Sequence, residues 1–222
     1  MIEQYLGITG GQLAAAAGQT VYMLFWGLLL GSLFGIPLGI LLTITRKGGI
    51  LQNKAVYALL NYTINIVRSV PYIILLVALM PLTKAIVGTR IGTKAALVSL
   101  VFYVTPFLAR LIEGSLLEVD KGIIEAAEAM GAAPVQVIRH FLIPEAMGSL
   151  ILSLTTGMIG LLGSTAMAGA IGGGGVGNLA LTYGYQQFNT PLMIATVIVL
   201  IVFVQLIQGL GNYLSKRVRT RK

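Results

Sequence analysis

Long apolar runs dominate the chain, and short charged or glycine-rich segments separate them. A membrane-spanning helix needs about 20 apolar residues in succession. Five stretches approach or exceed this length, at about residues 20–45, 57–83, 92–112, 147–171 and 191–213. The pattern therefore predicts an all-α integral membrane protein with five transmembrane helices, in which residues 20–213 form one transmembrane domain.

Composition supports this class of protein and narrows its chemistry. Of the 222 residues, 56% are hydrophobic and only 10% are charged, whereas soluble domains carry about 25% charged residues. Cysteine is absent and His140 is the single histidine, which excludes disulfide frameworks and thiol catalysis and leaves no metal site to expect. We expect no catalytic residues in this chain.

Four glycines in the first stretch share one helical stripe. Gly27, Gly31, Gly35 and Gly39 recur at every fourth position, and such a stripe lets a neighbouring helix approach closely. A hinge at Gly35-Ile36-Pro37 is the alternative, because proline removes a backbone hydrogen bond. We favour packing. In the second stretch, Arg68 interrupts the apolar run and is expected to reach toward the nearer headgroups.

The cations favour one orientation. With five spans, eleven Lys and Arg residues fall on one side and three on the other, Arg68 being left uncounted, and the richer side is cytoplasmic. Segment 1–19 is then external, the loop 113–146 is cytoplasmic, and the basic tail 214–222 is cytoplasmic and suited to anionic lipid. Because the cations flank apolar runs, the partner is the lipid bilayer and no nucleic acid is expected.

The loop between spans three and four is the polar part of the chain. Helix formers occupy Glu125 to Met130, Gly131 suits a C-terminal cap, and Pro134 suits the start of a second short helix that Pro144 ends. An apolar face is expected on that helix. Two interpretations stay open from spacing: a helix–turn–helix that presents small residues to a partner, or an amphipathic helix that covers the inner mouth of the bundle. The loop holds six of the seven acids, namely Glu113, Glu118, Asp120, Glu125, Glu128 and Glu145. The expected apolar face consists of Val135, Ile138, Phe141 and Leu142.

The residues of this loop resemble a family motif. Glu125-Ala126-Ala127, Gly131 and Pro144 match the EAA loop of ATP-binding cassette (ABC) importer permeases, and only Phe141 and Ile143 depart from it, each by one apolar residue for another. The resemblance implies a cytoplasmic coupling helix that docks on an ATPase subunit and transmits its closure to the membrane helices. It assigns coupling to Glu125, Ala126, Ala127, Gly131, Pro134 and Pro144.

Further stretches resemble the methionine-uptake branch of these permeases, at residues 65–76, 86–89 and 172–185. The resemblance implies a homodimer in the bacterial plasma (inner) membrane, with two ATPase subunits inside and a substrate-binding lipoprotein outside. A small amino acid, methionine, would be the cargo. ATP and Mg would be bound by the ATPase, so this chain would need no cofactor.

Two glycine motifs do not qualify as nucleotide sites. Segment 172–177 fits G-x-G-x-x-G, yet that fingerprint needs an acid about 20 residues later, and no acid follows Glu145. We therefore expect a tight external turn there. Gly88 and Gly92 near Lys94 do not form a phosphate-binding loop either, so the chain is not an enzyme by itself.

Mild polarity within the apolar stretches marks candidate pathway residues, although ordinary helix packing also uses such side chains. The candidates are Ser69, Thr155, Thr156, Met158, Ser164, Thr165 and Met167.

The leading hypothesis is thus the permease subunit of an ABC importer that works by alternating access. An ion-coupled secondary amino-acid transporter is the alternative, but such proteins place carboxylates or histidines inside their spans, and the predicted spans hold none. A membrane-embedded enzyme would need a nucleophile with a base, or metal ligands, and the spans offer neither.

Overall fold

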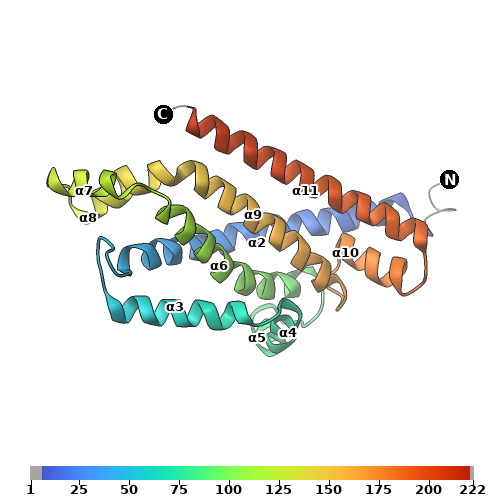
Figure 1. Cartoon of the computed structure of the whole chain (residues 1–222). Coiled ribbons are helices and arrows are strands. Elements are labelled where there is room, and N and C mark those ends of the chain that lie inside the picture. Colours follow the sequence, from blue (N-terminus) through green and yellow to red (C-terminus); the bar gives the residue numbers. More distant parts are fainter. Residues whose placement is uncertain (1–6, 221–222) are drawn as a thin grey trace. The chain divides into compact units, whose positions relative to one another are not determined.

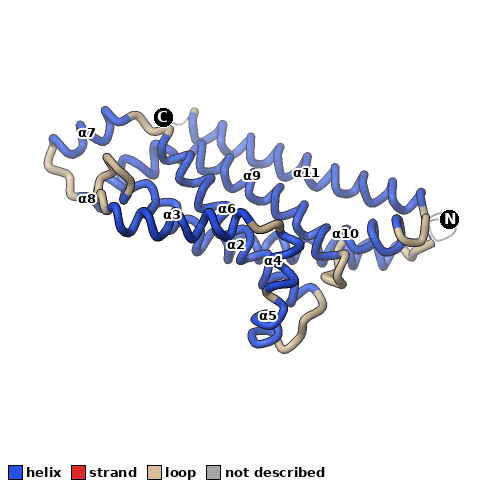
Figure 2. The backbone as a smooth tube through the Cα atoms, turned by 60° about the horizontal axis from the view of Figure 1, so that its bottom comes forward, coloured by secondary structure: helices blue, strands red, loops and turns tan. Residues whose placement is uncertain are grey.

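The computed structural model describes residues 7–220, and its regular elements are helices, with no strand in that range (Figures 1 and 2). Four helices are long: α2 (Gly10–Thr45), α6 (Thr93–Leu117), α9 (Ile143–Gly169) and α11 (Thr190–Arg219). The others are α3 (Lys54–Ser69), α4 (Tyr72–Ala78), α5 (Met80–Val87), α7 (Lys121–Ala129), α8 (Pro134–Gln136) and α10 (Val176–Asn178), with two π-helical segments, η1 (Val137–Leu142) and η2 (Leu179–Tyr185).

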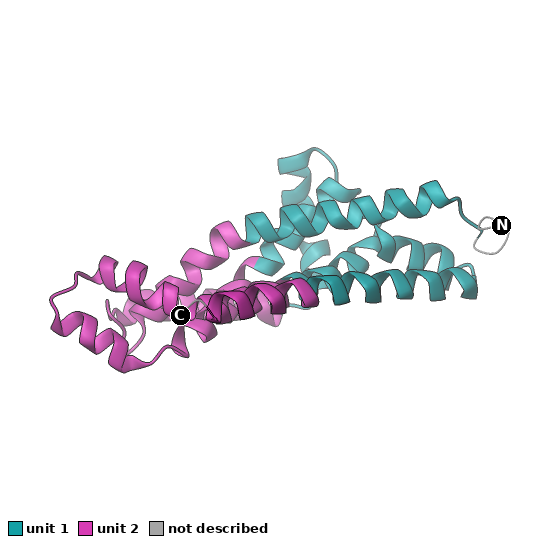
Figure 3. Ribbon diagram, turned by 90° about the horizontal axis from the view of Figure 1, so that it is seen from above, with its two compact units in different colours: residues 1–31, 70–104, 158–207 teal, residues 32–69, 105–157, 208–222 magenta. Residues whose placement is uncertain are grey.

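The chain divides into two compact units (Figure 3). Unit 1 comprises residues 1–31, 70–104 and 158–207, and unit 2 comprises residues 32–69, 105–157 and 208–222. Residues 1–6 of the expected external segment and 221–222 of the expected basic tail lie outside the described residues.

The all-α membrane class is confirmed. In the described range, four helical runs are long and apolar enough to cross a membrane: α2, α6, α11 and the run Pro134–Gly169. The pair α3 and α4 adds a fifth if the two count as one broken span. Helix α2 begins ten residues before the predicted stretch, because strong helix formers at Ala14 to Ala17 extend it.

The second predicted stretch is not one continuous helix, so that expectation needs correction. Helix α3 ends at Ser69 and α4 starts at Tyr72, so residues 70 and 71 belong to neither helix. The cause lies in Pro71, which has no backbone N–H and which disfavours helical dihedral angles at Val70 before it. A third short helix, α5, then completes the stretch and ends at Val87, where Gly88 caps it with a φ of +81°.

Pro144 does not stop the short helix before the fourth span, as the sequence had suggested. The structure has Pro144 as the second residue of α9, and helix continues through it from η1. In η1 the backbone is wound in the wider π form, so the Ile143 N–H donates to the carbonyl of Ile138. π winding is rare and occurs mostly as single turns inside longer helices, where it absorbs an irregularity.

The glycine stripe of α2 packs closely, as predicted. A Cβ at Gly27 would lie 2.8 Å from the Leu161 side chain in unit 1. In unit 2, a Cβ at Gly35 would lie 3.0 Å from Leu108, and one at Gly39 would lie 2.7 Å from Ile112. Helix α2 runs unbroken past Pro37, so packing accounts for the stripe.

We expect Gly39→Ala to cost about 1–3 kcal/mol of unfolding free energy, because the new methyl group overpacks the contact with α6. The matched control is Gly18→Ala in the same helix, where a Cβ meets nothing within 4 Å. There the change should be neutral or stabilising by up to about 1 kcal/mol, since alanine favours helix. Unfolding titrations in mixed micelles measure both, and equal effects would contradict the packing explanation.

The glycine-rich segment of unit 1 is a tight turn, as predicted, but it is not a free loop. Gly175 N–H donates to the Gln19 side chain (2.7 Å) and Val176 N–H donates to the buried Thr20 hydroxyl (2.9 Å). Positive φ angles at Gly172, Gly174 and Gly175 explain the glycines. The residues that follow the turn are helical and form α10 and η2.

Candidate functional site

Helix α7 carries the family motif, and both of its ends have a clear physical cause. At the start, the Asp120 carboxylate accepts a hydrogen bond from Gly122 N–H (2.6 Å), which is the usual role of an N-cap side chain. At the end, Gly131 adopts φ +82°. Its N–H donates to Glu128 O (2.9 Å), and Ala132 N–H donates to Ala127 O (3.1 Å). These two bonds form a Schellman motif, which confirms the predicted cap.

The outward side of α7 is small and open. Ala127 is fully buried, whereas the side chains of Glu125, Ala126 and Glu128 are exposed. Beyond the helix end, Met130 is 72% exposed. The EAA motif therefore presents one inward alanine and an exposed surface of small and acidic residues. Figure 1 shows α7 and α8 next to each other.

The second half of the motif also has a defined start. Pro134 is the first residue of α8, as predicted, and the Gln136 side chain accepts from Ala133 N–H (2.8 Å). The predicted apolar face needs correction at Val135, which is 71% exposed, because burial in this stretch falls on Val137 and Leu142. The π winding of η1 shifts the face, since the prediction assumed a regular α period.

Two hollows flank α7. One of about 530 Å³ lies on the side of Glu125 and Glu128, against the end of α2. The other, of about 520 Å³, lies on the side of Ile123. Protein atoms thus pack against α7 mainly around Ala127, and the helix stands partly clear of the rest of unit 2.

A polar cluster within unit 2 was missed by the sequence analysis. Glu113 was expected in the cytoplasmic loop, but it lies inside α6 and is buried. The Arg110 guanidinium donates to its carboxylate (2.6 Å) and to the side chains of Asn61 and Asn65 on α3. Arg110 Nε is buried without a hydrogen-bond partner. The sequence did contain a signal for this ion pair, since residues 110 and 113 are one helical turn apart and carry opposite charges.

Among the candidate pathway residues, three are packed into their surroundings. Thr155 donates to Ile151 O (2.8 Å), Ser164 to Gly160 O (3.1 Å) and Thr165 to Leu162 O (2.7 Å), and all three side chains are buried. Their hydroxyl groups are therefore satisfied by their own helix. This favours the packing interpretation for these three positions.

The other candidates are more open. In unit 2, Ser69 and Thr156 are exposed, and Ser69 donates to Asn65 O (2.8 Å). In unit 1, Met158 is half-buried and Met167 is 48% exposed. A role in the pathway stays a prediction for these residues.

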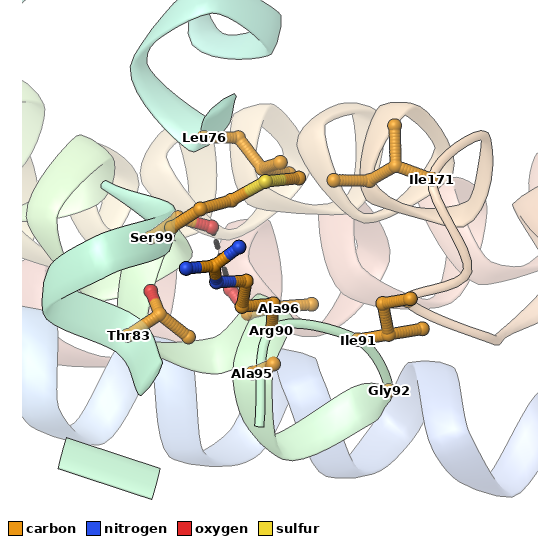
Figure 4. Close-up of a pocket in the computed structure, with 11 residues that line it drawn as sticks. Leu76, Thr83, Arg90, Ile91, Gly92, Ala95, Ala96, Ser99 and Ile171 are labelled. Carbon is orange, nitrogen blue, oxygen red and sulfur yellow. Dashed lines mark hydrogen bonds between the residues drawn. The ribbon is translucent and has the colours of Figure 1, made fainter. Parts of the chain in front are cut away.

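A small pocket in unit 1 does not qualify as a substrate site. Its volume of about 10 Å³ holds about one water molecule. Figure 4 shows the Arg90 side chain directed into it beside Thr83 and Ser99. The Ser99 hydroxyl also donates to Ala96 O (2.8 Å). Among the described residues, no group of three or more His, Cys, Asp and Glu side chains could hold a metal ion.

Residues 35–220 match the family described as the binding-protein-dependent transport system inner membrane component. The chain belongs to this family. The resemblance to ABC importer permeases inferred from the EAA loop is thereby confirmed. The match covers all of the described elements from the last third of α2 onward, including α7 and the polar cluster.

Relatives of this family member are similar over nearly the full length. This chain is 46% identical to the probable D-methionine transport system permease protein MetI of Vibrio cholerae. The alignment covers 99% of this chain and 98% of that relative. The chain is 43% identical over the whole length of the methionine import system permease protein MetP of Bacillus subtilis. A chain in the solved inward facing conformations of the MetNI methionine ABC transporter has a TM-score of 0.92, with 41% identity over 94% of this chain and 97% of that chain.

Proposed function

We propose that this chain is the membrane-spanning permease subunit of an ABC importer that moves methionine into the cell by alternating access. The single observation that carries the proposal is similarity to methionine permeases over nearly the whole chain, at 43–46% identity. The likeness to a chain of the MetNI transporter at a TM-score of 0.92 supports it further. ATP hydrolysis then takes place in partner subunits, where ATP and Mg are bound.

The proposed assembly is a dimer of this chain with two ATPase subunits on the cytoplasmic side and a substrate-binding lipoprotein outside. Five spans are proposed, with α3 and α4 together as the broken second span. The excess of cations on one side favours a cytoplasmic C-terminus and an external N-terminus.

The proposed coupling helix is α7. Its exposed side would dock on the ATPase through Glu125 and Ala126, while buried Ala127 seats the helix on unit 2. Gly131 ends the helix by a left-handed turn, and Pro134 and Pro144 lie where the chain returns through η1 into α9. Motion of α7 would thus pass into a spanning helix.

An ion-coupled secondary transporter is less well supported. Its best structural argument is Glu113, an acid within α6, because such transporters use carboxylates inside spans. That carboxylate is held by Arg110 at 2.6 Å, so it is occupied by a protein partner, and family membership favours the ABC importer.

The test is methionine uptake by vesicles that contain this permease with its ATPase, and with the binding lipoprotein on the outside. We expect uptake to require ATP inside the vesicles and to fall to background when the ATPase is omitted. A variant ATPase that binds but does not hydrolyse ATP is the matched control. Uptake driven by an ion gradient with no ATPase present would overturn the proposal.

A further inference from the structure

Helix α7 depends on its ends for support. Within the helix only Ala127 is fully buried, and hollows of about 530 Å³ and 520 Å³ lie on its two flanks. A helix of nine residues with little packing has small stability of its own. Whatever holds the residues just before Lys121 therefore helps to decide where α7 stands.

The end of α11 makes two hydrogen bonds to the start of α9. Ser215, which is buried, donates to Gly148 O (2.8 Å). One turn later, Arg219 Nη2 donates to the Ser149 hydroxyl (3.4 Å). The same Ser149 hydroxyl donates to Glu118 Oε2 (2.7 Å). Glu118 lies two residues before Asp120, the N-cap of α7, so a chain of side-chain contacts leads from α11 to the start of α7.

Close packing accompanies these bonds. A Cβ at Gly148 would lie 2.6 Å from Arg219 Nε and 2.8 Å from its Cγ. The arginine side chain therefore lies directly on the backbone of α9, where only glycine leaves room. The hollow beside it is lined by three acids, Glu118, Asp120 and Glu145, and by Arg219, so the guanidinium is also attracted by the charges around it.

We propose that Arg219 is a positioning residue for α7, acting through Ser149 and Glu118. The end of α11 then helps to hold the coupling helix in place, in addition to being a basic tail at the lipid surface. The inference rests on the proposed function in one respect, namely that α7 couples ATP hydrolysis to transport. Lys216, Arg217 and Arg219 are all exposed, so Arg217 provides a comparison of the same charge and similar exposure in the same turn.

The first experiment measures methionine taken up per ATP hydrolysed, in vesicles that contain the complete complex. Arg219→Ala should lower this ratio about threefold, the factor expected for one exposed hydrogen bond at the low end of the usual range. The rate of ATP hydrolysis should change much less, because the variant leaves the ATPase subunits unaltered. Arg217→Ala is the matched control and should leave the ratio unchanged. Equal effects of the two variants, or effects that vanish in vesicles without anionic lipid, would overturn the proposal in favour of a lipid anchor.

The second experiment does not depend on transport. Hydrogen exchange of the Gly122 and Ile123 amides, which bond to Asp120, reports the order of the first turn of α7 in the permease dimer without ATPase. Arg219→Ala and Ser149→Ala should each raise the exchange rate of these amides about threefold. The double variant should exchange no faster than either single variant, because both residues belong to one chain of contacts. Arg217→Ala should leave the exchange rate unchanged.

Glu118→Gln keeps an acceptor for Ser149 and should retain at least half of the original protection, because a neutral acceptor still makes the bond. The proposal would be overturned if Arg219→Ala left the exchange rate unchanged, or if the losses of protection in the two single variants added up in the double variant. If the original complex did not transport methionine, the proposed function would be wrong, yet the exchange measurements would still decide whether α11 positions α7.

Discussion

The Gly131→Pro variant is expected to remain in the membrane as a folded helical protein and to lose ATP-driven uptake. Gly131 adopts φ +82°, and its N–H donates to Glu128 O. Proline fixes φ near −65° and has no N–H, so the change costs about 3 kcal/mol or more at the end of α7. Because α7 is short and thinly packed, that cost exceeds what holds its last turn. Uptake in vesicles and helix content by circular dichroism measure the two outcomes.

Gly131→Asn is the matched control at the same position. Asparagine tolerates the left-handed conformation better than other residues, and a Cβ at Gly131 meets nothing within 4 Å. This variant should therefore keep most of the uptake. If asparagine were as damaging as proline, the backbone explanation would fail. If Gly131→Pro transported at the original rate, α7 would not be the coupling element.

Glu113→Ala is expected to destabilise the protein by about 3–5 kcal/mol, because it leaves the charge of Arg110 without its carboxylate in a buried place. The two side chains are only 17% and 7% exposed, so water compensates little. The measurement is the free energy of unfolding in mixed micelles.

Two further variants test whether the loss of stability comes from breaking the buried ion pair. Arg110→Met combined with Glu113→Leu removes both charges and should recover most of the stability, since apolar replacements of a buried pair are often neutral. Arg68→Ala removes an exposed cation from α3 and should change stability by no more than about 0.5 kcal/mol. A double variant as unstable as Glu113→Ala would contradict the account.

The sequence predicted those features that depend on local rules. Apolar runs of sufficient length marked the spanning helices, and the helix formers at Glu125 to Met130 followed by Gly131 marked α7 and its cap. Glycines at every fourth position marked the packed stripe of α2. Each of these signals acts within a few residues along the chain, and the structure has the corresponding contacts at Gly35, Gly39 and Gly131.

Features that depend on distant neighbours were missed. The third span was predicted to end at about residue 112, although Leu116 and Leu117 continue the apolar pattern and α6 runs on to Leu117. The position of Glu113 in that helix makes sense only once α3 supplies Asn61 and Asn65 opposite Arg110. Likewise, the break at Val70 was visible in Pro71, but the hydropathy of the flanking residues outweighed that signal.

Candidate pathway residues were harder still, because polarity along a helix does not say which neighbour covers a side chain. Thr155 is buried beside Gly211, whose missing side chain leaves the room it occupies. Its neighbour Thr156 is exposed. Two adjacent threonines thus have opposite surroundings, and only the packing of other helices distinguishes them.

The turn at Gly172 to Gly175 has a practical consequence. Its backbone is held by Gln19 and Thr20 from α2, and Gly92 N–H donates to Gly172 O (3.1 Å). A fluorophore or spin label attached beside this turn would therefore follow unit 1 as a rigid reporter, and changes in its signal during turnover would read out movement of the unit instead of local loop fluctuation.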